Sequence, residues 1–166
     1  DDFLVPFAGH SKVAAVASNL LGRNIFTSVS FNHMIAVIGN IVCIVSTNNS
    51  FNQVGTLSTY IGNVYIDGNN VNQIAICDQQ DIWIYNYISG SFTKAVIDFI
   101  PGYISYQNGR FVAAALDTAT WRLSDIGDGT SWPNDSFHVG TFQTKPDSVV
   151  ATQRFPGRGN LLYVMG

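Results

Sequence analysis

Hydrophobic and polar residues alternate along most of the chain from about residue 30 onward, which is the pattern of half-buried β-strands. The apolar runs are short, rich in β-branched and aromatic residues, and bounded by Asn, Gly, Asp or Pro. They read HMIAVIG, IVCIVS, NVYIDG, QIAICD, DIWIYNY, GYISYQNG, RFVAAAL, TWRLSD and NLLYVMG. Short strands separated by turns in this way predict an all-β fold.

Only the segment SKVAAVASNLLG has the period of a helix. Its apolar residues fall near one helical face, Ser11 is a suitable N-cap, and Gly22 is a suitable C-terminal stop. We therefore expect an N-terminal segment, residues 1–29, with a short helix over about residues 11–22. The β-strands would occupy residues 30–166.

The strands repeat with a period of about 40 residues, and each unit has three clear strands and a weaker fourth. Trp83 and Trp121 occupy the same point of the unit, as do Ile74 and Phe111. A four-stranded unit of this length is typical of a β-propeller blade. The chain holds about three to four such blades, whereas closed propellers have about 4–8. We therefore expect a fragment of a larger propeller that is incomplete at the C-terminus, in preference to a chain that closes with a second copy.

Composition narrows the functional classes. Charged residues make up 11% of the chain, against roughly 25% in an ordinary soluble domain, and the net charge is −3 with no cationic run. Sequence-specific nucleic-acid binding is therefore disfavoured, and contact with DNA would be passive, in a channel. No apolar run approaches the roughly 20 residues of a membrane span, so no membrane partner is expected. Cys43 and Cys77 lie in apolar runs and are expected to be buried, reduced thiols.

The sequence shows no local signature of catalysis. All eleven acidic residues are Asp, and most follow a strand beside Gly, Asn or Gln, where Asp usually accepts bonds from its own turn. His10, His33 and His138 have no metal-ligand spacing, and neither a nucleophile elbow nor a phosphate-binding loop occurs. We expect no enzyme activity, no catalytic residue, no metal and no cofactor.

The stretch SDIGDGTSW, residues 124–132, is interpreted as a structural turn of a blade. Asp125 or Asp128 would accept hydrogen bonds from turn N–H groups. Gly127 and Gly129 would supply positive φ angles, and Trp132 would clamp the turn against the sheet.

Four segments, in this order, resemble the packaged-DNA stabilisation proteins of short-tailed bacteriophages, also called tail accessory factors. They are DGNNVNQIAICDQQDIWIYNYISGSFTKAV (Asp67–Val96), GYISYQNGRFVAAA (Gly102–Ala115), WRLSDIGDGTSW (Trp121–Trp132) and KPDSVVATQRFPGRGNLLYVMG (Lys145–Gly166). The resemblance extends from about residue 35 to residue 166, and the first 30 residues match less well. The loop at residues 154–159 is longer than the family's turn.

This resemblance implies a structural component of the virion tail, assembled in the bacterial host cytoplasm. Such proteins join the tail in several copies, close the portal exit channel after genome packaging, and form a platform for further tail proteins. The partners implied are other phage tail and portal proteins and further copies of the chain. The mildly acidic composition fits a channel wall that repels DNA phosphates.

Two other functions fit the sequence. One is a carbohydrate-binding or sialidase-like propeller module, because SDIGDGTSW nearly matches the Asp-box S-x-D-x-G-x-T-W, although its spacing differs. Aromatic residues and carboxylates lining one groove would mark that function. The other is an interaction propeller of cellular origin.

Overall fold

The computed structural model describes residues 20–28, 30–46, 50–69, 71–142, 147–154 and 162–165. The helix expected over residues 11–22 lies outside these residues except for its last three positions. Gly22 is the first residue of a β-strand, so the β region begins eight residues before the expected boundary at residue 30. This strand was missed because only Ile25 and Phe26 are apolar in GRNIFTS, too few to show an alternating pattern.

The described chain is all-β, as expected, and every sheet is an antiparallel meander in chain order. The first sheet contains β1 (Gly22–Ser28), β2 (Phe31–Ile38), β3 (Ile41–Val45) and β4 (Phe51–Thr56). The second contains β5 (Tyr65–Gly68), β6 (Gln73–Cys77), β7 (Ile82–Asn86) and β8 (Ser91–Lys94). The third contains β9 (Pro101–Gln107), β10 (Arg110–Ala115), β11 (Thr120–Leu123) and β12 (Val139–Thr141). β13 (Ala151–Arg154) and β14 (Leu162–Met165) form a two-stranded sheet.

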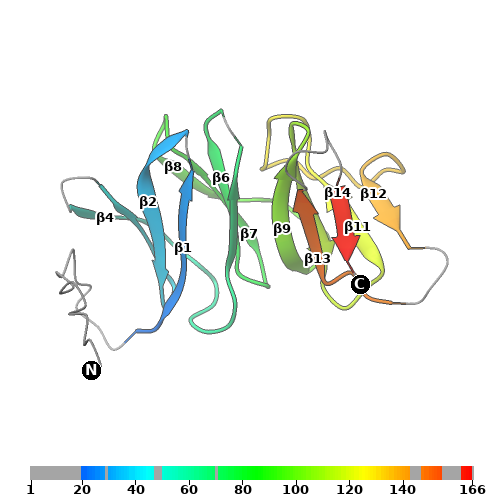
Figure 1. Ribbon diagram of the computed structural model, residues 1–166, viewed down its shortest axis with the longest axis horizontal. Helices are drawn as coiled ribbons and strands as arrows, with labels where there is room; N and C mark the ends of the chain where they lie inside the picture. Colours follow the sequence, from blue (N-terminus) through cyan, green and yellow to red (C-terminus); the bar gives the residue numbers. More distant parts are fainter. Residues whose placement is uncertain are drawn as a thin grey trace, which may run out of the picture.

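The three four-stranded sheets lie side by side, and β13 packs against the third (Figure 1). The first strands of successive sheets contact one another, β1 with β5, β5 with β9, and β9 with β13. The predicted repeat is confirmed at the positions that defined it. Ile74 and Phe111 lie in the second strand of their sheets, and Trp83 and Trp121 lie in the third.

One hydrophobic core lies between each pair of neighbouring four-stranded sheets, and the second sheet contributes to both. Ile74 and Ile76 of β6 pack into the core shared with the first sheet. Ala75 and Cys77 face the third sheet, because successive side chains of a strand point to opposite faces. All four residues are fully buried. Burying an isoleucine side chain contributes about 1.5–3 kcal/mol, so the middle sheet holds the stack together from both sides.

The two cysteines are free and buried, as predicted. Burial raises the pKa of the Cys43 thiol to about 11 and that of Cys77 to about 12, because it disfavours the thiolate. Both thiols therefore serve as small apolar core residues. Within the described ranges, no helix has the length and apolar character that crossing a bilayer requires.

Candidate functional site

The loop from residue 124 to residue 138 joins β11 to β12 and contains the turn singled out in the sequence. Its first part is a tight turn in which the N–H of Asp128 donates to the carbonyl of Asp125 at 3.3 Å. Gly127 has a φ of 71°, as expected, and its N–H donates to the carbonyl of Gly109 at 2.7 Å. The turn is thereby fixed against the hairpin between β9 and β10.

The two aspartates of the turn have different roles. Asp128 accepts hydrogen bonds from the N–H and the hydroxyl of Thr130, at 2.9 and 2.7 Å. Burial alone would raise the pKa of Asp128, but the bonds from Thr130 and Gln73 lower it below its ordinary value. Asp125 accepts a bond from the Ser131 hydroxyl at 2.6 Å, and its N–H donates to the Ser131 carbonyl. Asp128 is thus the residue that accepts a turn N–H.

The expectation for the φ angle of Gly129 was wrong, because this residue is not among the glycines with positive φ. The site instead requires a residue without a side chain. A Cβ at Gly129 would lie 2.6 Å from Cδ1 of Ile84 and 2.8 Å from Cδ2 of Phe111. The Gly129 N–H also donates to Oε1 of Gln73 at 2.8 Å, so this part of the loop is seated directly on the second sheet.

Trp132 closes the turn. Its indole N–H donates to the carbonyl of Gly129 at 2.8 Å, and the side chain is 8% exposed. The ring packs edge-on against Phe99 and belongs to the core between the second and third sheets. The five residues expected to build a structural turn therefore lie together in one loop that is packed against two sheets.

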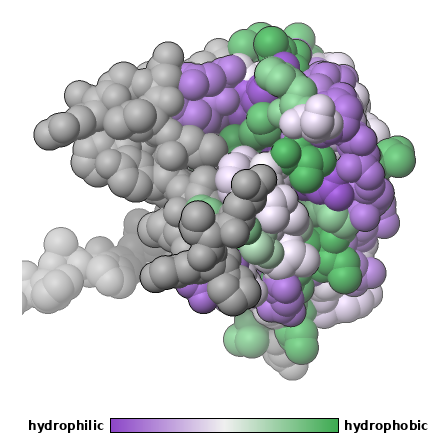
Figure 2. Space-filling model, turned by 90° about the vertical axis from the view of Figure 1, so that its right-hand side faces the viewer, coloured by the Kyte–Doolittle hydropathy of each residue, from purple (hydrophilic) through white to green (hydrophobic). Residues whose placement is uncertain are grey.

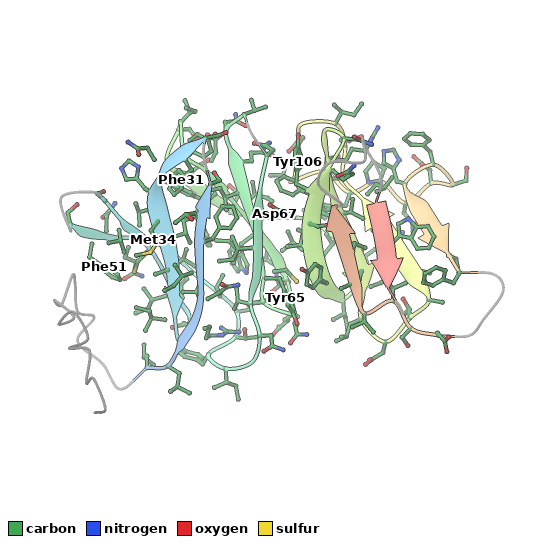
Figure 3. All side chains as sticks on the ribbon, in the orientation of Figure 1. Phe31, Met34, Phe51, Tyr65, Asp67 and Tyr106 are labelled. Carbon is green, nitrogen blue, oxygen red and sulfur yellow. The ribbon has the colours of Figure 1, made fainter. Side chains whose placement is uncertain are left out.

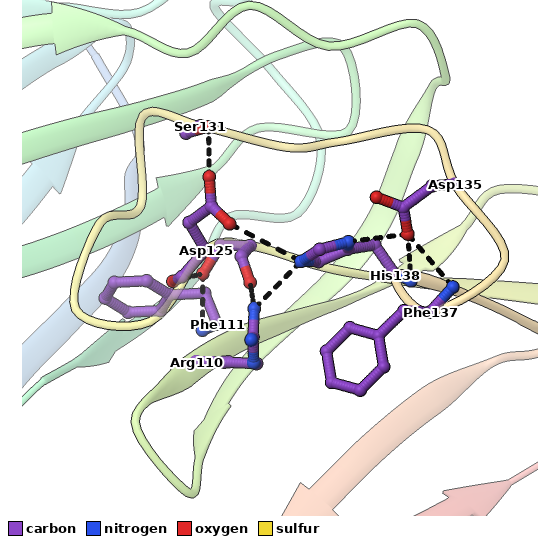
Figure 4. A network of polar contacts seen from close by, with 8 residues as sticks. Arg110, Phe111, Asp125, Ser131, Asp135, Phe137 and His138 are labelled. Atoms are coloured by element: carbon purple, nitrogen blue, oxygen red, sulfur yellow. Dashed lines mark hydrogen bonds and ion pairs between the residues drawn. The ribbon is translucent and has the colours of Figure 1, made fainter.

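A second polar network follows in the same loop and is centred on His138 (Figure 4). The Nδ1 atom of His138 lies 2.8 Å from Oδ1 of Asp135, and Nε2 lies 3.0 Å from Nη1 of Arg110 and 3.4 Å from Oδ1 of Asp125. The hydrogen bond to His138 lowers the pKa of Asp135 below its usual value. Phe137 covers the network, with its ring 5.0 Å from the Arg110 guanidinium carbon.

Arg110 extends this network to the strand that follows the β9–β10 turn. Its Nη1 donates to the carbonyl of Ser124 at 2.6 Å. The Ser124 hydroxyl accepts a bond from the N–H of Phe111 at 3.0 Å. The network therefore joins both ends of the loop to the first residues of β10.

This arrangement fits a polar network that holds the loop in place better than an acid–base site. Both ring nitrogens of His138 are engaged, and its side chain is nearly buried. The Ser131 hydroxyl is bonded to Asp125, and the Thr130 hydroxyl is bonded to Asp128. Sequence reasoning missed this network because Arg110 and His138 lie far apart in the chain. The Asp135-x-x-His138 spacing was the one local signal.

Metal binding has no support in the described ranges, since no group of three or more His, Cys, Asp or Glu side chains is placed to hold an ion. The aspartates of the loop take part in hydrogen bonds and ion pairs within the protein.

No protein-family model and no curated protein matches the chain. Solved structures do match its fold. The computationally designed Ika4 protein has a TM-score of 0.63 at 10% identity, over 95% of this chain and 98% of that chain. Sqt1 of Saccharomyces cerevisiae has a TM-score of 0.56 at 14% identity, over 82% of this chain and 39% of that chain. The WD40 domain of Neurospora crassa Pan2 has a TM-score of 0.50 at 10% identity, over 86% of this chain and 47% of that chain.

Identities this low show the fold alone. In its described residues the chain has an all-β, propeller-type fold with three four-stranded blades, the three sheets described above, followed by the two-stranded sheet. It spans less than half the length of the Sqt1 and Pan2 chains.

Proposed function

We propose that this chain is a structural module of a bacteriophage tail, of the packaged-DNA stabilisation type. It would help to close the portal exit channel after genome packaging and carry further tail proteins. The observation that supports this proposal is the ordered set of four segments that resemble that family. They fall on the second blade, on β9 and β10, on β11 with its loop, and on the two-stranded sheet with its flanks.

The apolar outer face of the first sheet supports a role in assembly. Met34, Val45 and Phe51 are cross-strand neighbours on β2, β3 and β4, so their side chains share one face. Figure 3 shows Met34 and Phe51 on the side of the sheet turned away from the second sheet. Ile25, 65% exposed, borders a hollow of about 540 Å³ that is lined by residues of the paired strands β1 and β2. Val45 is only 7% exposed, so Ile25 and the hollow beside it are the apolar surface that we propose for contact with a partner.

The opposite end of the molecule differs in the distribution of its hydrophobic residues. In Figure 2 hydrophobic and hydrophilic residues alternate over the described part of that end instead of gathering into one patch. The proposed contacts would therefore be made mainly through the first sheet. A net charge of −3 over the chain gives no attraction for a phosphate backbone, which suits a module that lets DNA pass.

The polar network around His138 supports a structural role for the loop that carries the family-like segment WRLSDIGDGTSW. Hydrogen bonds from Gly129 to Gln73 and from Arg110 to Ser124 hold this loop to the blades at both ends. A loop fixed in this way suits a protein that must keep its shape under the load of a packed genome. We propose that the chain has no enzymatic role.

A DNA-retention assay tests the proposal. The coding region is deleted from the phage or prophage genome that carries it, and the nuclease-protected DNA in the resulting heads is measured. We expect heads that package DNA, lose it and are not infectious, and we expect the purified full-length protein to restore retention. Heads that keep their DNA and infect normally without the protein would contradict the proposal.

A pair of variants links the assay to the outer face. Ile25→Lys places a charge on the apolar face of the first sheet, whereas Ile88→Lys changes an isoleucine, 75% exposed, in the turn between β7 and β8. We expect the first variant to fold, as judged by circular dichroism, yet fail to restore retention, and the second to restore it. Equal activity of the two folded variants would remove the first sheet from the proposed interface.

A further inference from the structure

A pocket of about 350 Å³ lies at the end of the interface between the first and second blades. Its volume is at the small end of the roughly 300–1,000 Å³ typical of ligand pockets. It is lined by Ser30, Phe31, Asn32, His33, Ile44, Ser46, Asn52, Tyr85 and Tyr87. Figure 3 places Phe31 at this end of the two sheets. The pocket is separate from the loop between β11 and β12.

Aromatic rings form one wall of the pocket. Phe31 lies at the centre, with its ring centroid 5.3 Å from that of Tyr87, 5.4 Å from that of His33 and 6.4 Å from that of Tyr85. Phe31 and Tyr85 are each only 5% exposed and belong to the core between the two blades. Phe31 and Tyr85 are therefore held in place by the core rather than by a ligand, which makes this part of the wall preformed.

Three polar side chains of the pocket, those of Tyr85, Asn32 and Asn52, have hydrogen-bonding capacity to spare. Tyr85 is only 5% exposed as a residue, but its hydroxyl is not among the fully buried polar atoms without a partner, and it makes no hydrogen bond to another described residue. Burial also raises the pKa of Tyr85 and keeps its hydroxyl protonated, so that it can donate. The side-chain amides of Asn32 and Asn52 have no hydrogen-bond partner among the described residues either, and they are exposed at the rim. A hydroxyl that is accessible from the pocket and has no protein partner can hydrogen-bond a ligand there, which adds affinity.

The chemistry of the lining selects one class of ligand. No Asp, Lys or Arg lines the pocket, so it offers no carboxylate, ammonium or guanidinium group to pair with an ionic ligand. Amides and hydroxyls can both donate and accept, which matches the hydroxyls of a sugar. The C–H face of a pyranose ring is apolar and packs against an aromatic ring. We propose that this pocket binds a neutral saccharide, with Tyr87 and His33 as the ring platform and Tyr85, Asn32 and Asn52 as hydrogen-bonding groups.

Saturation-transfer NMR on the full chain tests this proposal directly. The probes are the methyl glycosides of glucose, galactose, mannose, rhamnose and N-acetylglucosamine, with sialyllactose as the anionic comparison. We expect transfer to at least one neutral glycoside and none to the sialic acid unit. The affinity for the best neutral probe is then measured for each variant.

Tyr85→Phe removes only the hydroxyl and keeps the ring in the core. Loss of one hydrogen bond to a neutral partner should weaken the affinity by about three- to ten-fold. Tyr103→Phe is the control, because Tyr103 is a partly buried tyrosine on β9, away from the pocket. Asn52→Ala tests the rim without touching the core and should also weaken binding.

Three outcomes would overturn the proposal. They are no transfer to any neutral glycoside, transfer only to the anionic probe, and equal affinity of Tyr85→Phe, Asn52→Ala and the Tyr103→Phe control. A free sugar and a sugar on a cell surface share this chemistry, and binding of labelled protein to immobilised polysaccharide, competed by the free glycoside, separates the two sources. The proposal is independent of the phage-tail function, because it depends only on the pocket.

Discussion

The carboxylate of Asp67 on β5 accepts a hydrogen bond from the backbone N–H of Tyr106 on β9, at 2.6 Å. The first strands of neighbouring blades do not pair as a sheet, so this bond fixes one blade relative to the next through a side chain. The other oxygen of Asp67 accepts the N–H of Gly68 at 2.8 Å. Beside it, the rings of Tyr65 and Tyr103 meet across the same interface, with centroids 4.5 Å apart.

Replacing Asp67 with Ala should destabilise the protein by about 1–2 kcal/mol, because the half-buried N–H of Tyr106 then loses a charged acceptor. Asp67→Asn should cost less, since an amide oxygen can still accept. Asp67→Asn should also lower the pKa of Tyr103. Burial is the main cause that raises this pKa, and the negative charge of Asp67 is the second. Urea unfolding and the absorbance of tyrosinate measure the two effects. Wild-type stability of Asp67→Ala would show that the bond does not hold the blades together.

The two glycines of the Asp125–Trp132 turn should differ in how well they tolerate substitution. Gly127 has a positive φ with no atom within 4 Å of the site of a Cβ, so Asn, which tolerates this backbone region, should cost less than about 1 kcal/mol. Gly129→Asn should cost about 1–3 kcal/mol or more, since its side chain would enter the space of Ile84 and Phe111. Urea unfolding of both variants measures the difference.

A matched pair separates the two causes. Gly127→Val should destabilise through backbone strain alone, whereas Gly129→Ala should already do so through steric overlap. If Gly129→Ala were as stable as the wild type, close packing would not be the reason for glycine at this position.

The second blade could be predicted from the sequence because its second and third strands are largely apolar on both faces. QIAIC and IWIYN are almost wholly buried between two neighbours, so their hydrophobic runs are continuous and bounded by turn residues. The fourth strands are weaker signals. SFTK has one partly buried residue, Phe92, which stacks on Trp83, and the other three are exposed.

The candidate site was predictable only where its contacts are local. The hydrogen bonds from Thr130 to Asp128 span two residues, and a turn signature captures them. The position of Gly129 depends on Gln73, which is 56 residues away, so its role as a close-packing residue cannot be read from the turn itself. The contact between Arg110 and His138 could not be predicted either, because these residues are also far apart in the sequence.

Acid should remove the contribution of Asp135 to stability. The folded-state pKa of this residue is lowered, first by its hydrogen bond with His138, so its charged form stabilises the protein above the unfolded-state pKa of about 3.9. That contribution is lost as the pH falls through the folded-state value. The stability difference between wild type and Asp135→Asn should therefore be constant at neutral pH and shrink below about pH 4. Urea unfolding across this range measures it, and a difference that persists or grows in acid would contradict the assignment.

Arg23 of β1 binds the connection between the first and second blades through all three guanidinium nitrogens. Nε donates to the carbonyl of Gly62 at 2.9 Å, and Nη1 donates to those of Gly39 and Thr59 at 3.0 and 2.6 Å. Nη2 donates to the Thr59 hydroxyl and to the carbonyl of Ile61 at 2.8 and 2.9 Å. Partial burial lowers the pKa of Arg23, and the charge of Asp78 opposes that fall. One side chain thus orders a segment that has no strand partner of its own.

Arg23→Lys should destabilise the protein by about 1–2 kcal/mol, because an ammonium group cannot reproduce a planar fork with five donors, and Arg23→Met should cost more. Lys94→Met is the control. Its ion pair with Asp81 at 2.7 Å involves a lysine side chain that is 51% exposed, and such pairs contribute at most about 1 kcal/mol. Urea unfolding compares the three variants. If Arg23→Lys were as stable as the wild type, the guanidinium fork would not be what orders the connection between the first two blades.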